Sequence, residues 1–498
     1  MNKLRLINYR GFEDTGEVEL RPITILVGAN SSGKSSFLKF FPLLQQSIGI
    51  KVNGMFLWDG ENVDFKDFKN TVRNGEGELQ FDFVIGKLQL SRQFVQKKHE
   101  LKDVNISVTL AAHGDNYDYL KSVGVEYEKV KIKYSFTQNG ECTDIVVNSL
   151  SSKDFKEENI LVETDNNLFP SLSFKYEKTG MAFEMPVSPL SVLKLQQIIK
   201  GKEIIEPIEI LEYEIRERNH YFTVEDARKK AQADLKNGSD ELLAKLTDIY
   251  LYRVSGIILR IINEYFSQLA KSFSYVLPLR TIVQRYYRFQ NRDVDQIDPD
   301  GGNMAIFLCG LNDKQLKSYN DWLWNIFHFK ISVKRSEGHV EMLLHEEGKD
   351  VRNLVDVGFG YTQVLPILSI IWKSIYKRSK MSKGHEEPVY IAIEQPELHL
   401  HPRFQACFAR MLAAAITDCR KKNHQLCLII ETHSETIMNE IGNQIESNNL
   451  SNEDVNVVLF GADREGMNTY VHTTTFSEDG VLNEWPFGFF ADDDVYRN

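Results

Sequence analysis

The sequence lacks several features that identify whole classes of protein. Its 498 residues hold five cysteines, and no two lie close enough for the paired spacing of a zinc site or a disulfide framework. No apolar run reaches the roughly 18 residues that a membrane-spanning helix needs. Lys and Arg number 59 against 70 Asp and Glu, so the formal net charge of −11 excludes a globally basic surface for nucleic acid.

The same absences predict where the protein works. The scattered cysteines suit a reducing compartment. Met1–Arg5 is typical of the start of a strand rather than of a signal peptide. We therefore expect a cytoplasmic protein without a membrane partner. The length of 498 residues exceeds that of one ordinary domain, so two or three lobes are expected.

The most informative stretch that is present is Gly28–Ser36, which reads Gly-Ala-Asn-Ser-Ser-Gly-Lys-Ser-Ser and satisfies the phosphate-loop pattern in full. The β-branched run Pro22–Val27 before it predicts a buried strand, and Phe37–Phe41 after it predicts a helix. In such a loop the backbone N–H groups converge on an anion. Lys34 would reach the β- and γ-phosphates, and Ser35 would hold Mg²⁺. The expected nucleotide-binding residues of the loop are Gly28, Asn30, Ser31, Ser32, Gly33, Lys34, Ser35 and Ser36.

After the phosphate loop, the spacing of apolar residues changes along the chain. Between about residue 78 and residue 185 the pattern is mostly of period two, which predicts an antiparallel, half-exposed sheet. From about 186 the period is helical, and Asp240–Ser272 is the longest amphipathic run, read as one helix. A second apolar face on this helix leaves two interpretations open, a core position or part of an oligomer interface. The residues of that face are Leu242, Ile249, Ile258 and Ile262.

The second half of the chain holds three polar clusters beside apolar segments. Asp356–Pro366 is a Gly-containing loop that enters an apolar helix, whose N-terminus suits an anion. The strand Val389–Ile393 ends in Glu-Gln-Pro-Glu, and the strand Leu426–Ile430 ends in Glu-Thr-His-Ser. Because a parallel α/β sheet places such strand ends beside a bound phosphate, we expect these clusters to join the phosphate loop.

Together these motifs resemble those of ABC-type ATPase heads, in the branch that holds the RecF, SMC and OLD-like proteins. Within it the chain resembles bacterial OLD-like AAA-family ATPases, some of which are subunits of two-gene anti-phage systems such as Septu and PARIS. The resemblance covers residues 1–95 and 275–498, and the segment 477–490 resembles the C-terminal segment of one group in that branch. It implies an α/β fold, an ABC-type P-loop ATPase head with a mixed sheet, an antiparallel β-rich N-terminal lobe and a helical insertion.

The resemblance also assigns roles to residues. The phosphate loop matches the Walker A motif. Glu394 takes the Walker B acidic position that holds Mg²⁺, and His433 matches the switch histidine that contacts the γ-phosphate. The stretch Gly358–Gln363 matches the signature loop, which in this family reaches the nucleotide of the other protomer. Its nucleotide-binding candidates are Gly358, Gly360, Thr362 and Gln363, in a stretch that lacks a strict Ser-Gly-Gly-Gln.

One departure from the family pattern bears on the rate of hydrolysis. Gln395 stands where many ABC ATPases carry the glutamate that polarises the attacking water. A neutral amide can orient water but cannot accept its proton, so slow ATP hydrolysis is compatible with the sequence. Glu397 is the next carboxylate, and it could act as the base or only anchor the turn. His399 and His401 fit a structural turn better than a metal site.

Three segments are expected as domains. Residues 1–185 would form an N-terminal ATPase lobe with Walker A and a β-rich sheet, and 186–274 a helical insertion. Residues 275–498 would form a C-terminal lobe with the signature loop, Walker B, the switch histidine and the tail. The long insertion between Lys34 and Gly358 argues against a transporter head, and the segment after His433 lacks the acidic series of a fused nuclease.

The resemblance therefore implies an ATP- and Mg²⁺-dependent switch. The expected assembly is a homodimer or higher homo-oligomer that controls a separate effector protein, a nuclease of the HNH or TOPRIM kind. The alternative is a RecF/SMC-like repair ATPase that binds DNA directly. Two segments leave contact with nucleic acid open. One is Arg285–Arg288, in which two tyrosines that could stack on bases lie between two arginines, and the other is the basic stretch 373–383.

Overall fold

The computed structural model describes residues 1–90, 100–114, 117–155, 159–164, 166–178, 181–200, 221–235, 239–278, 280, 283–288, 294, 296–336, 338–376, 388–462 and 469–485. The chain has the expected α/β fold and divides into two compact units. Unit 1 combines Met1–Glu19 with Leu43–Lys271, and unit 2 combines Leu20–Pro42 with Ser272–Asn498. This division differs from the three expected segments, because the strand before the phosphate loop pairs with strands near the C-terminal end of the sequence.

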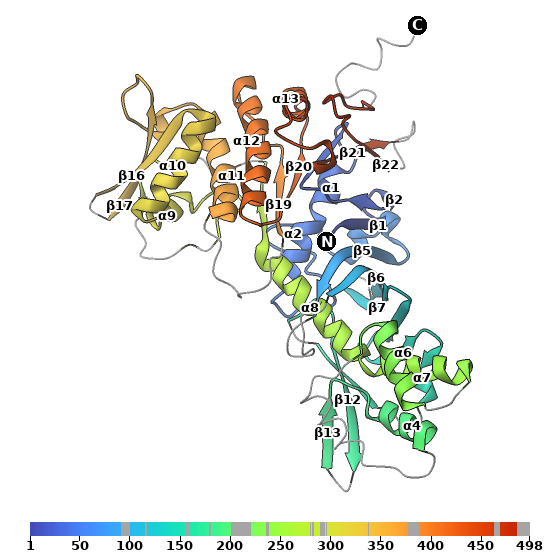
Figure 1. Ribbon diagram of the computed structural model, residues 1–498. Helices are drawn as coiled ribbons and strands as arrows, with labels where there is room; N and C mark the ends of the chain where they lie inside the picture. Colours follow the sequence, from blue (N-terminus) through green and yellow to red (C-terminus); the bar gives the residue numbers. More distant parts are fainter. Residues whose placement is uncertain are drawn as a thin grey trace. The chain divides into compact units, whose positions relative to one another are not determined.

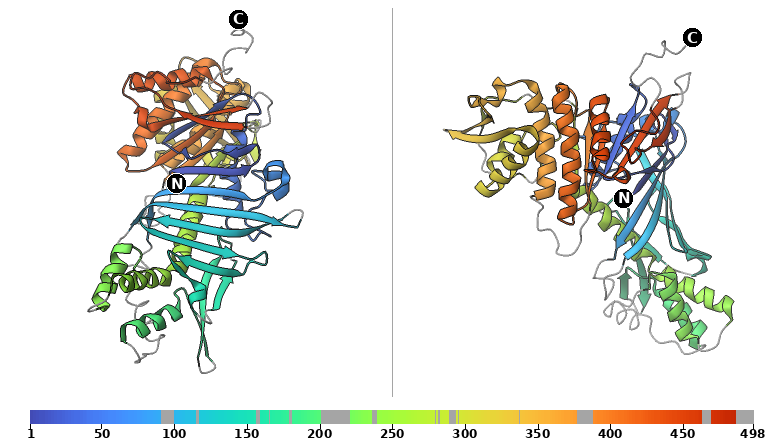
Figure 2. Two further views of the ribbon diagram at one scale, coloured as in Figure 1. Left: turned by 90° about the vertical axis from the view of Figure 1, so that its right-hand side faces the viewer. Right: turned by 45° about the horizontal axis from the view of Figure 1, so that its top comes forward.

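Unit 1 is built on an antiparallel sheet with the strand order β10-β9-β8-β7-β6-β5-β1-β2, to which β3 adds by pairing with β1. The period-two pattern between 78 and 185 is confirmed, since buried and exposed residues alternate along β8. Figure 2 shows these strands, coloured blue to teal, side by side. The strand β7 was not expected. The bounds are β1 (Lys3–Tyr9), β2 (Phe12–Asp14), β3 (Val18–Glu19), β5 (Leu79–Gln89), β6 (Glu100–His113), β7 (Tyr117–Tyr127), β8 (Val130–Phe136), β9 (Cys142–Val147) and β10 (Leu150–Ser151).

Unit 1 also contains a three-stranded sheet and most of the helical insertion. The single helix expected over Asp240–Ser272 is wrong, because the chain breaks at Val254 into two helices. The second apolar face is largely buried within the chain, with Ile249, Ile258 and Ile262 fully inaccessible, so it is core rather than an oligomer surface. The bounds are β11 (Asn159–Glu163), β12 (Ser171–Lys178), β13 (Met181–Met185), α3 (Phe68–Thr71), α4 (Pro189–Lys200), α6 (Val224–Asp234), α7 (Asp240–Arg253), α8 (Ser255–Ser272), η1 (Arg73–Gly75) and η2 (Ser152–Asp154).

Unit 2 is organised around strands in the order β22-β21-β4-β20-β19-β14, in which all neighbours are parallel except β21 and β22, which are antiparallel. Every residue of β4, β19 and β20 is buried. Continuous apolar runs of this kind are typical of parallel strands covered on both faces. The bounds are β4 (Ile23–Gly28), β14 (Phe273–Val276), β19 (Val389–Glu394), β20 (Leu426–Glu431), β21 (Val455–Ala462) and β22 (Thr469–Thr474).

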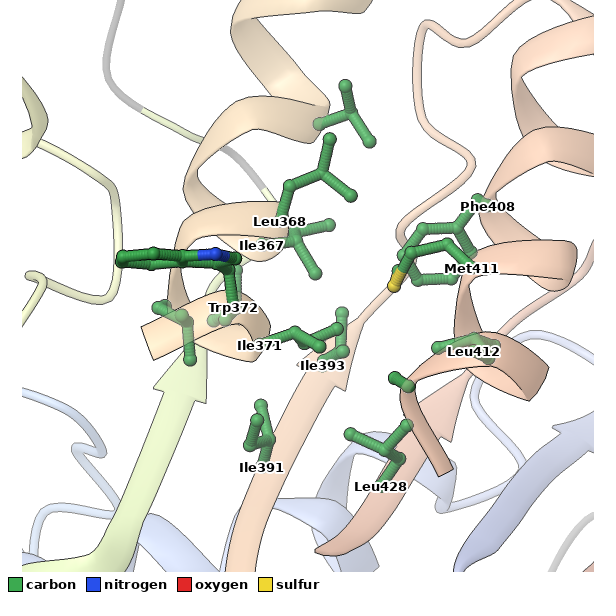
Figure 3. Close-up of a cluster of buried hydrophobic side chains, with 14 of the residues drawn as sticks. Ile367, Leu368, Ile371, Trp372, Ile391, Ile393, Phe408, Met411, Leu412 and Leu428 are labelled. Atoms are coloured by element: carbon green, nitrogen blue, oxygen red, sulfur yellow. The ribbon is translucent and has the colours of Figure 1, made fainter. Parts of the chain in front are cut away.

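Two helices, α11 (Phe359–Tyr376) and α12 (Pro402–Lys421), cover one face of this sheet. In the close-up of Figure 3, Ile371 of α11 and Leu412 of α12 point toward the β19 strand that carries Ile391 and Ile393. Figure 1 shows α13 (Glu435–Glu446) next to α12, with which it packs. The short helix α1 (Lys34–Leu38) lies on the opposite face. Its Phe37 contacts Phe460 of β21, whereas the neighbouring Leu459 points to the cluster with α11 and α12, since residues alternate sides along a strand.

The remaining elements of unit 2 form a smaller sheet and its helices, placed around α10 in Figure 1. Among the described residues, no helix combines the length and the apolar character needed to cross a membrane. The bounds are α9 (Met304–Cys309), α10 (Asp313–Phe327), β15 (Tyr287–Arg288), β16 (Phe329–Ser336), β17 (His339–Glu346), β18 (Arg352–Asn353), η3 (Leu354–Asp356) and η4 (Asn452–Asp454), while α2 (Phe40–Ser47) carries the chain from unit 2 into unit 1.

Candidate functional site

The phosphate loop leaves β4 at Gly28 and enters α1 at Lys34. Gly28 has a positive φ of 151°, and a Cβ at this position would lie 2.1 Å from the carbonyl oxygen of Phe460 on β21. Only glycine fits there, so the sheet itself requires this residue of the motif. Ser31 and Gly33 also have positive φ, which gives the loop the tight curvature expected of an anion cradle.

Lys34 lies inside the loop rather than in solvent. Its side chain is buried, and its Nζ donates hydrogen bonds to the carbonyl oxygens of Gly28 at 3.0 Å and of Ala29 at 2.6 Å. Burial lowers the pKa of Lys34, while the nearby charges of Glu431 and Glu397 raise it. The ammonium is thus held at the mouth of the cradle by weak neutral acceptors that a phosphate could replace.

Two carboxylates stand at the ends of neighbouring strands. Glu394 ends β19 and Glu431 ends β20, and the two residues are direct partners in the parallel register. Both are buried, on the face of the sheet that carries α1. Ser35 Oγ donates a 2.8 Å hydrogen bond to Glu431 Oε1. Burial raises the pKa of both carboxyls, and the charge of Glu394 adds to the rise at Glu431.

Glu394 has its own neighbours. The Tyr275 hydroxyl donates a hydrogen bond to Glu394 Oε1, and Lys39 Nζ lies 3.9 Å from the same oxygen. Arg280 donates to the Glu394 carbonyl oxygen at 3.3 Å. These contacts anchor the expected Walker B position at the edge of the phosphate loop.

The residues after each strand end form the third part of the site. Gln395 has a positive φ of 40°, uncommon for a residue other than glycine, and its backbone N–H donates to the Glu431 carbonyl oxygen at 2.8 Å. Glu397 Oε1 accepts a 2.6 Å hydrogen bond from the backbone N–H of His433. Burial raises the pKa of Glu397, against the hydrogen bond from His433. Burial, with the charge of Lys34, lowers the pKa of His433, so its imidazole is neutral at pH 7.

These groups enclose a cavity of about 210 Å³. Its lining brings together most of the expected phosphate-loop residues with Gln395 and His433, and adds Glu431, which belongs to an expected strand-end cluster but had been given no role. Glu394 and Glu397 lie next to the lining rather than on it. The lining residues are Asn30, Ser31, Ser32, Gly33, Lys34, Ser35, Ser36, Gln395, Glu431 and His433.

Glu431 could have been found from the sequence. It ends an apolar strand in the same way as Glu394 ends the previous one, and period two places both carboxylates on one face of a parallel sheet. The family pattern drew attention to His433 instead, two residues later. The sequence therefore contained the signal, a second glutamate at a strand end, and only the register that sets it opposite Glu394 had to come from the structure.

The cavity suits a nucleoside triphosphate with a divalent cation. It combines a lysine, backbone amides of a phosphate loop, a serine hydroxyl and a carboxylate, which are the groups that bind phosphate and Mg²⁺. Ser32 Oγ and Glu431 Oε2 are buried and have no hydrogen-bond partner among the described residues. Buried polar atoms without partners are costly, so both point to a ligand in the cavity.

The signature-loop residues lie elsewhere in unit 2. Gly358 precedes α11, and Gly360, Thr362 and Gln363 belong to its first turns. None of the four lines the phosphate-loop cavity as the structure describes it. Phe359 in this loop is 61% exposed. The segment is held by an ion pair in which Arg285 binds the carboxylate of Asp356, at 2.9 Å for Nη1 to Oδ2.

The other candidates have structural partners. Arg285 is committed to Asp356, which leaves Tyr286 and Arg288 exposed in the tetrapeptide. His401 caps α12, its Nδ1 accepting from the backbone N–H of Arg403 at 3.2 Å. In the described part of the chain no three His, Cys, Asp or Glu side chains gather into a metal site. Most of the basic stretch, from 377 on, and the tail from 486 on lie outside the described residues.

Solved structures of SMC heads align with nearly the whole chain at low similarity. The Pyrococcus furiosus head bound to the C-terminal domain of ScpA has a TM-score of 0.34 and 10% identity, over 95% of this chain and 96% of that chain. The Thermotoga maritima head has a TM-score of 0.34 and 9% identity, over 95% and 97%. An SMC head bound to the C-terminal winged-helix domain of ScpA has a TM-score of 0.35 and 9% identity, over 96% and 98%.

Comparison of the sequence with known proteins found a relative and a matching family. The chain is 30% identical over 128 residues to Endonuclease GajA of Bacillus cereus (strain HuB5-5), which covers 25% of this chain and only 17% of GajA. The AAA ATPase domain family matches residues 1–438, which include the phosphate loop, both strand-end clusters and His433. This match confirms the ATPase type expected from the motifs: the chain belongs to the AAA ATPase domain family.

Proposed function

We propose that this protein is a nucleotide-gated switch that binds and slowly hydrolyses ATP with Mg²⁺. The observation that carries the proposal is the convergence of Lys34, Ser35, Gln395 and His433 on one cavity at the carboxyl ends of parallel strands. Ligands of open parallel sheets bind at that edge.

The residues have separate roles in this proposal. Lys34 leaves the carbonyl oxygens of Gly28 and Ala29 and binds the β- and γ-phosphates. The neutral imidazole of His433 donates a hydrogen bond to the γ-phosphate. Ser35 would hold Mg²⁺ beside the two strand-end carboxylates, of which Glu394 is the expected Walker B position, and the bound metal would offset the charge that develops on the phosphates.

In this proposal Gln395 sets the rate of ATP hydrolysis. Its backbone is held in a left-handed conformation at the cavity, where its amide can orient a water molecule. Since an amide cannot accept the proton of that water, hydrolysis is slow and the ATP-bound state is long-lived. A long-lived bound state suits a switch better than a motor.

The second protomer completes the site. The signature loop Gly358–Gln363 lies outside the phosphate-loop cavity of its own chain and exposes Phe359. In a homodimer or higher homo-oligomer this loop would bind the nucleotide held by the other copy. ATP binding then drives association, because each nucleotide is shared by two chains.

The partner is proposed by analogy. By its resemblance to the ATPase subunits of two-gene anti-phage systems, the switch controls a separate effector nuclease of the HNH or TOPRIM kind. The relative GajA is named an endonuclease, but the match covers 17% of its length. Direct DNA binding, as in RecF/SMC-like repair ATPases, is the alternative, for which Arg285 would have to exchange its exposed ion pair with Asp356 for a phosphate.

The test is the mass of the purified protein by light scattering, with and without Mg²⁺ and ATP, with phosphate release measured on the same samples. We expect a larger assembly with ATP and slow turnover. Lys34→Ala removes charge-assisted hydrogen bonds and should weaken ATP binding about 10- to 100-fold. A monomer with brisk turnover would contradict the shared site, and full ATP affinity in the variant would contradict the role of Lys34.

A further inference from the structure

The last residue of β20, Glu431, is a buried carboxylate that lines the phosphate-loop cavity. Glu431 is only 2% exposed. It stands directly opposite Glu394 in the parallel register. Of the two carboxylates, Glu431 is thus the one that faces the space where phosphates would lie.

Only one of the two carboxylate oxygens of Glu431 accepts a hydrogen bond from the described residues. Oε1 accepts from Ser35 Oγ at 2.8 Å, and Oε2 has no partner among the described residues. The cations nearby have other contacts, since Lys34 Nζ donates to two carbonyl oxygens and Lys39 Nζ lies 3.9 Å from Glu394. A buried carboxylate with an unused oxygen is stable only if a further cation or donor reaches it.

The hydrogen bond from Ser35 sets the direction of the serine hydroxyl. A hydroxyl has one hydrogen and two lone pairs. When the hydrogen is directed to Glu431, the lone pairs of Ser35 are left for a cation. Glu394 has no such link to the phosphate loop among the hydrogen bonds described, where its side chain accepts from Tyr275.

We propose that Glu431 positions the divalent cation of this nucleotide site, by orienting Ser35 and by offering Oε2 to the hydrated metal. The negative charge that is missing at Gln395, directly after β19, is thereby supplied from the end of the neighbouring strand. The inference rests on the proposed function, because it assumes that the cavity binds a nucleotide with its metal.

The experiment compares nucleotide binding with and without the metal. The affinity for the non-hydrolysable analogue AMP-PNP is measured by calorimetry in Mg²⁺ and in EDTA, for the wild type and for Glu431→Gln, Glu431→Asp and Glu394→Gln. Glu446→Gln, a change of an exposed glutamate at the end of α13, is the matched control. Mn²⁺ binding in the presence of AMP-PNP, followed by electron paramagnetic resonance, gives a second reading on the same variants.

In Glu431→Gln, the factor by which Mg²⁺ tightens AMP-PNP binding should fall about 10- to 100-fold, as for other residues that orient metal ligands, while the affinity in EDTA is kept. Glu431→Asp should retain part of the factor, because it keeps the charge, and Glu394→Gln should lose less. If Glu431→Gln keeps the full Mg²⁺ factor, or if Glu431→Asp loses as much as Glu431→Gln, the inference is overturned. If the wild type binds no AMP-PNP at all, the proposed function itself fails.

Discussion

Glu397 shows how one hydrogen bond narrows a chemical interpretation. As the next carboxylate after Gln395 in the sequence, it could serve as the base of hydrolysis or as an anchor of the turn. Its Oε1 accepts from the backbone N–H of His433, and it lies outside the cavity lining. This position favours the anchor, which holds the histidine loop against the turn after β19.

Replacing the Glu397 carboxylate by an amide distinguishes the two roles, because an amide can accept a hydrogen bond but cannot act as a base. A side-chain amide could still accept the hydrogen bond from His433, so we expect Glu397→Gln to keep ATP turnover within about fivefold of the wild type. Glu397→Ala removes the acceptor and should lower turnover about tenfold or more, with ATP affinity less affected. The measurement is steady-state phosphate release at saturating ATP. Equal inactivity of both variants, with a loss of about 100-fold or more, would restore Glu397 as the base.

The buried carboxylate of Asp118 makes the free energy of unfolding depend on pH. Asp118 on β7 accepts hydrogen bonds from the backbone N–H of Met55 and from Trp58 Nε1, each at 2.8 Å. It thereby ties the loop before α3 to the sheet of unit 1. Burial raises the pKa of Asp118 to about 6, so its ionised form is disfavoured in the folded protein.

The sign of the pH effect follows from linkage. Because the folded pKa is above the unfolded value of about 3.9, the folded protein binds more protons, and stability from this group falls as pH rises through about 4 to 6. The loss is about 3 kcal/mol over that window. Asp118→Asn removes the dependence. The free energy of unfolding in urea, variant minus wild type, should shift by about that amount in favour of the variant between pH 4 and pH 7. A difference that is flat with pH would mean that Asp118 ionises normally.

At the scale of elements, the core between α11, α12 and the sheet holds the strand ends in place. Leu412 of α12 is fully buried in this cluster (Figure 3). Leu412→Ala should lower the free energy of unfolding by about 2–5 kcal/mol through lost burial and the cavity left behind. Val481→Ala, at a side chain that is 62% exposed, should change it by less than about 0.5 kcal/mol. Chemical denaturation compares the two, and similar small effects would mean that the core repacks around the cavity.

At the scale of the whole molecule, the decisive question is whether two copies share one nucleotide. Gly358 has open space where a Cβ would stand, so Gly358→Asp should leave the protomer folded while placing a negative charge in the signature loop. The second variant, Lys34→Ala, has an inactive phosphate loop and an intact signature loop. Each protein alone should lack ATPase activity.

Mixing the two variants separates shared sites from independent ones. In randomly exchanged dimers half of the assemblies are mixed, and each mixed dimer has one intact composite site, so about a quarter of the wild-type activity should return. The measurement is phosphate release from an equimolar mixture after exchange. Activity no greater than the sum of the separate variants would show that the signature loop does not act in the other copy.

Local sequence determined those parts of the protein that depend on neighbours in the chain. The curvature of the phosphate loop needs glycines at Gly28 and Gly33, and the apolar runs before Glu394 and before Glu431 are long enough to specify buried strands. These features were predictable, because each is set by backbone freedom or by side-chain alternation within a few residues.

Tertiary structure decided what depends on partners far apart in the chain. The position of β4 between β20 and β21 assigns the phosphate loop to unit 2, although most of the residues near it in the sequence belong to unit 1. The break at Val254 likewise divides a helix whose periodicity continues through it. Register alone sets Glu431 opposite Glu394 and within reach of Ser35. The energy that selects one pairing comes from contacts across the sheet, so no stretch of sequence contains it by itself.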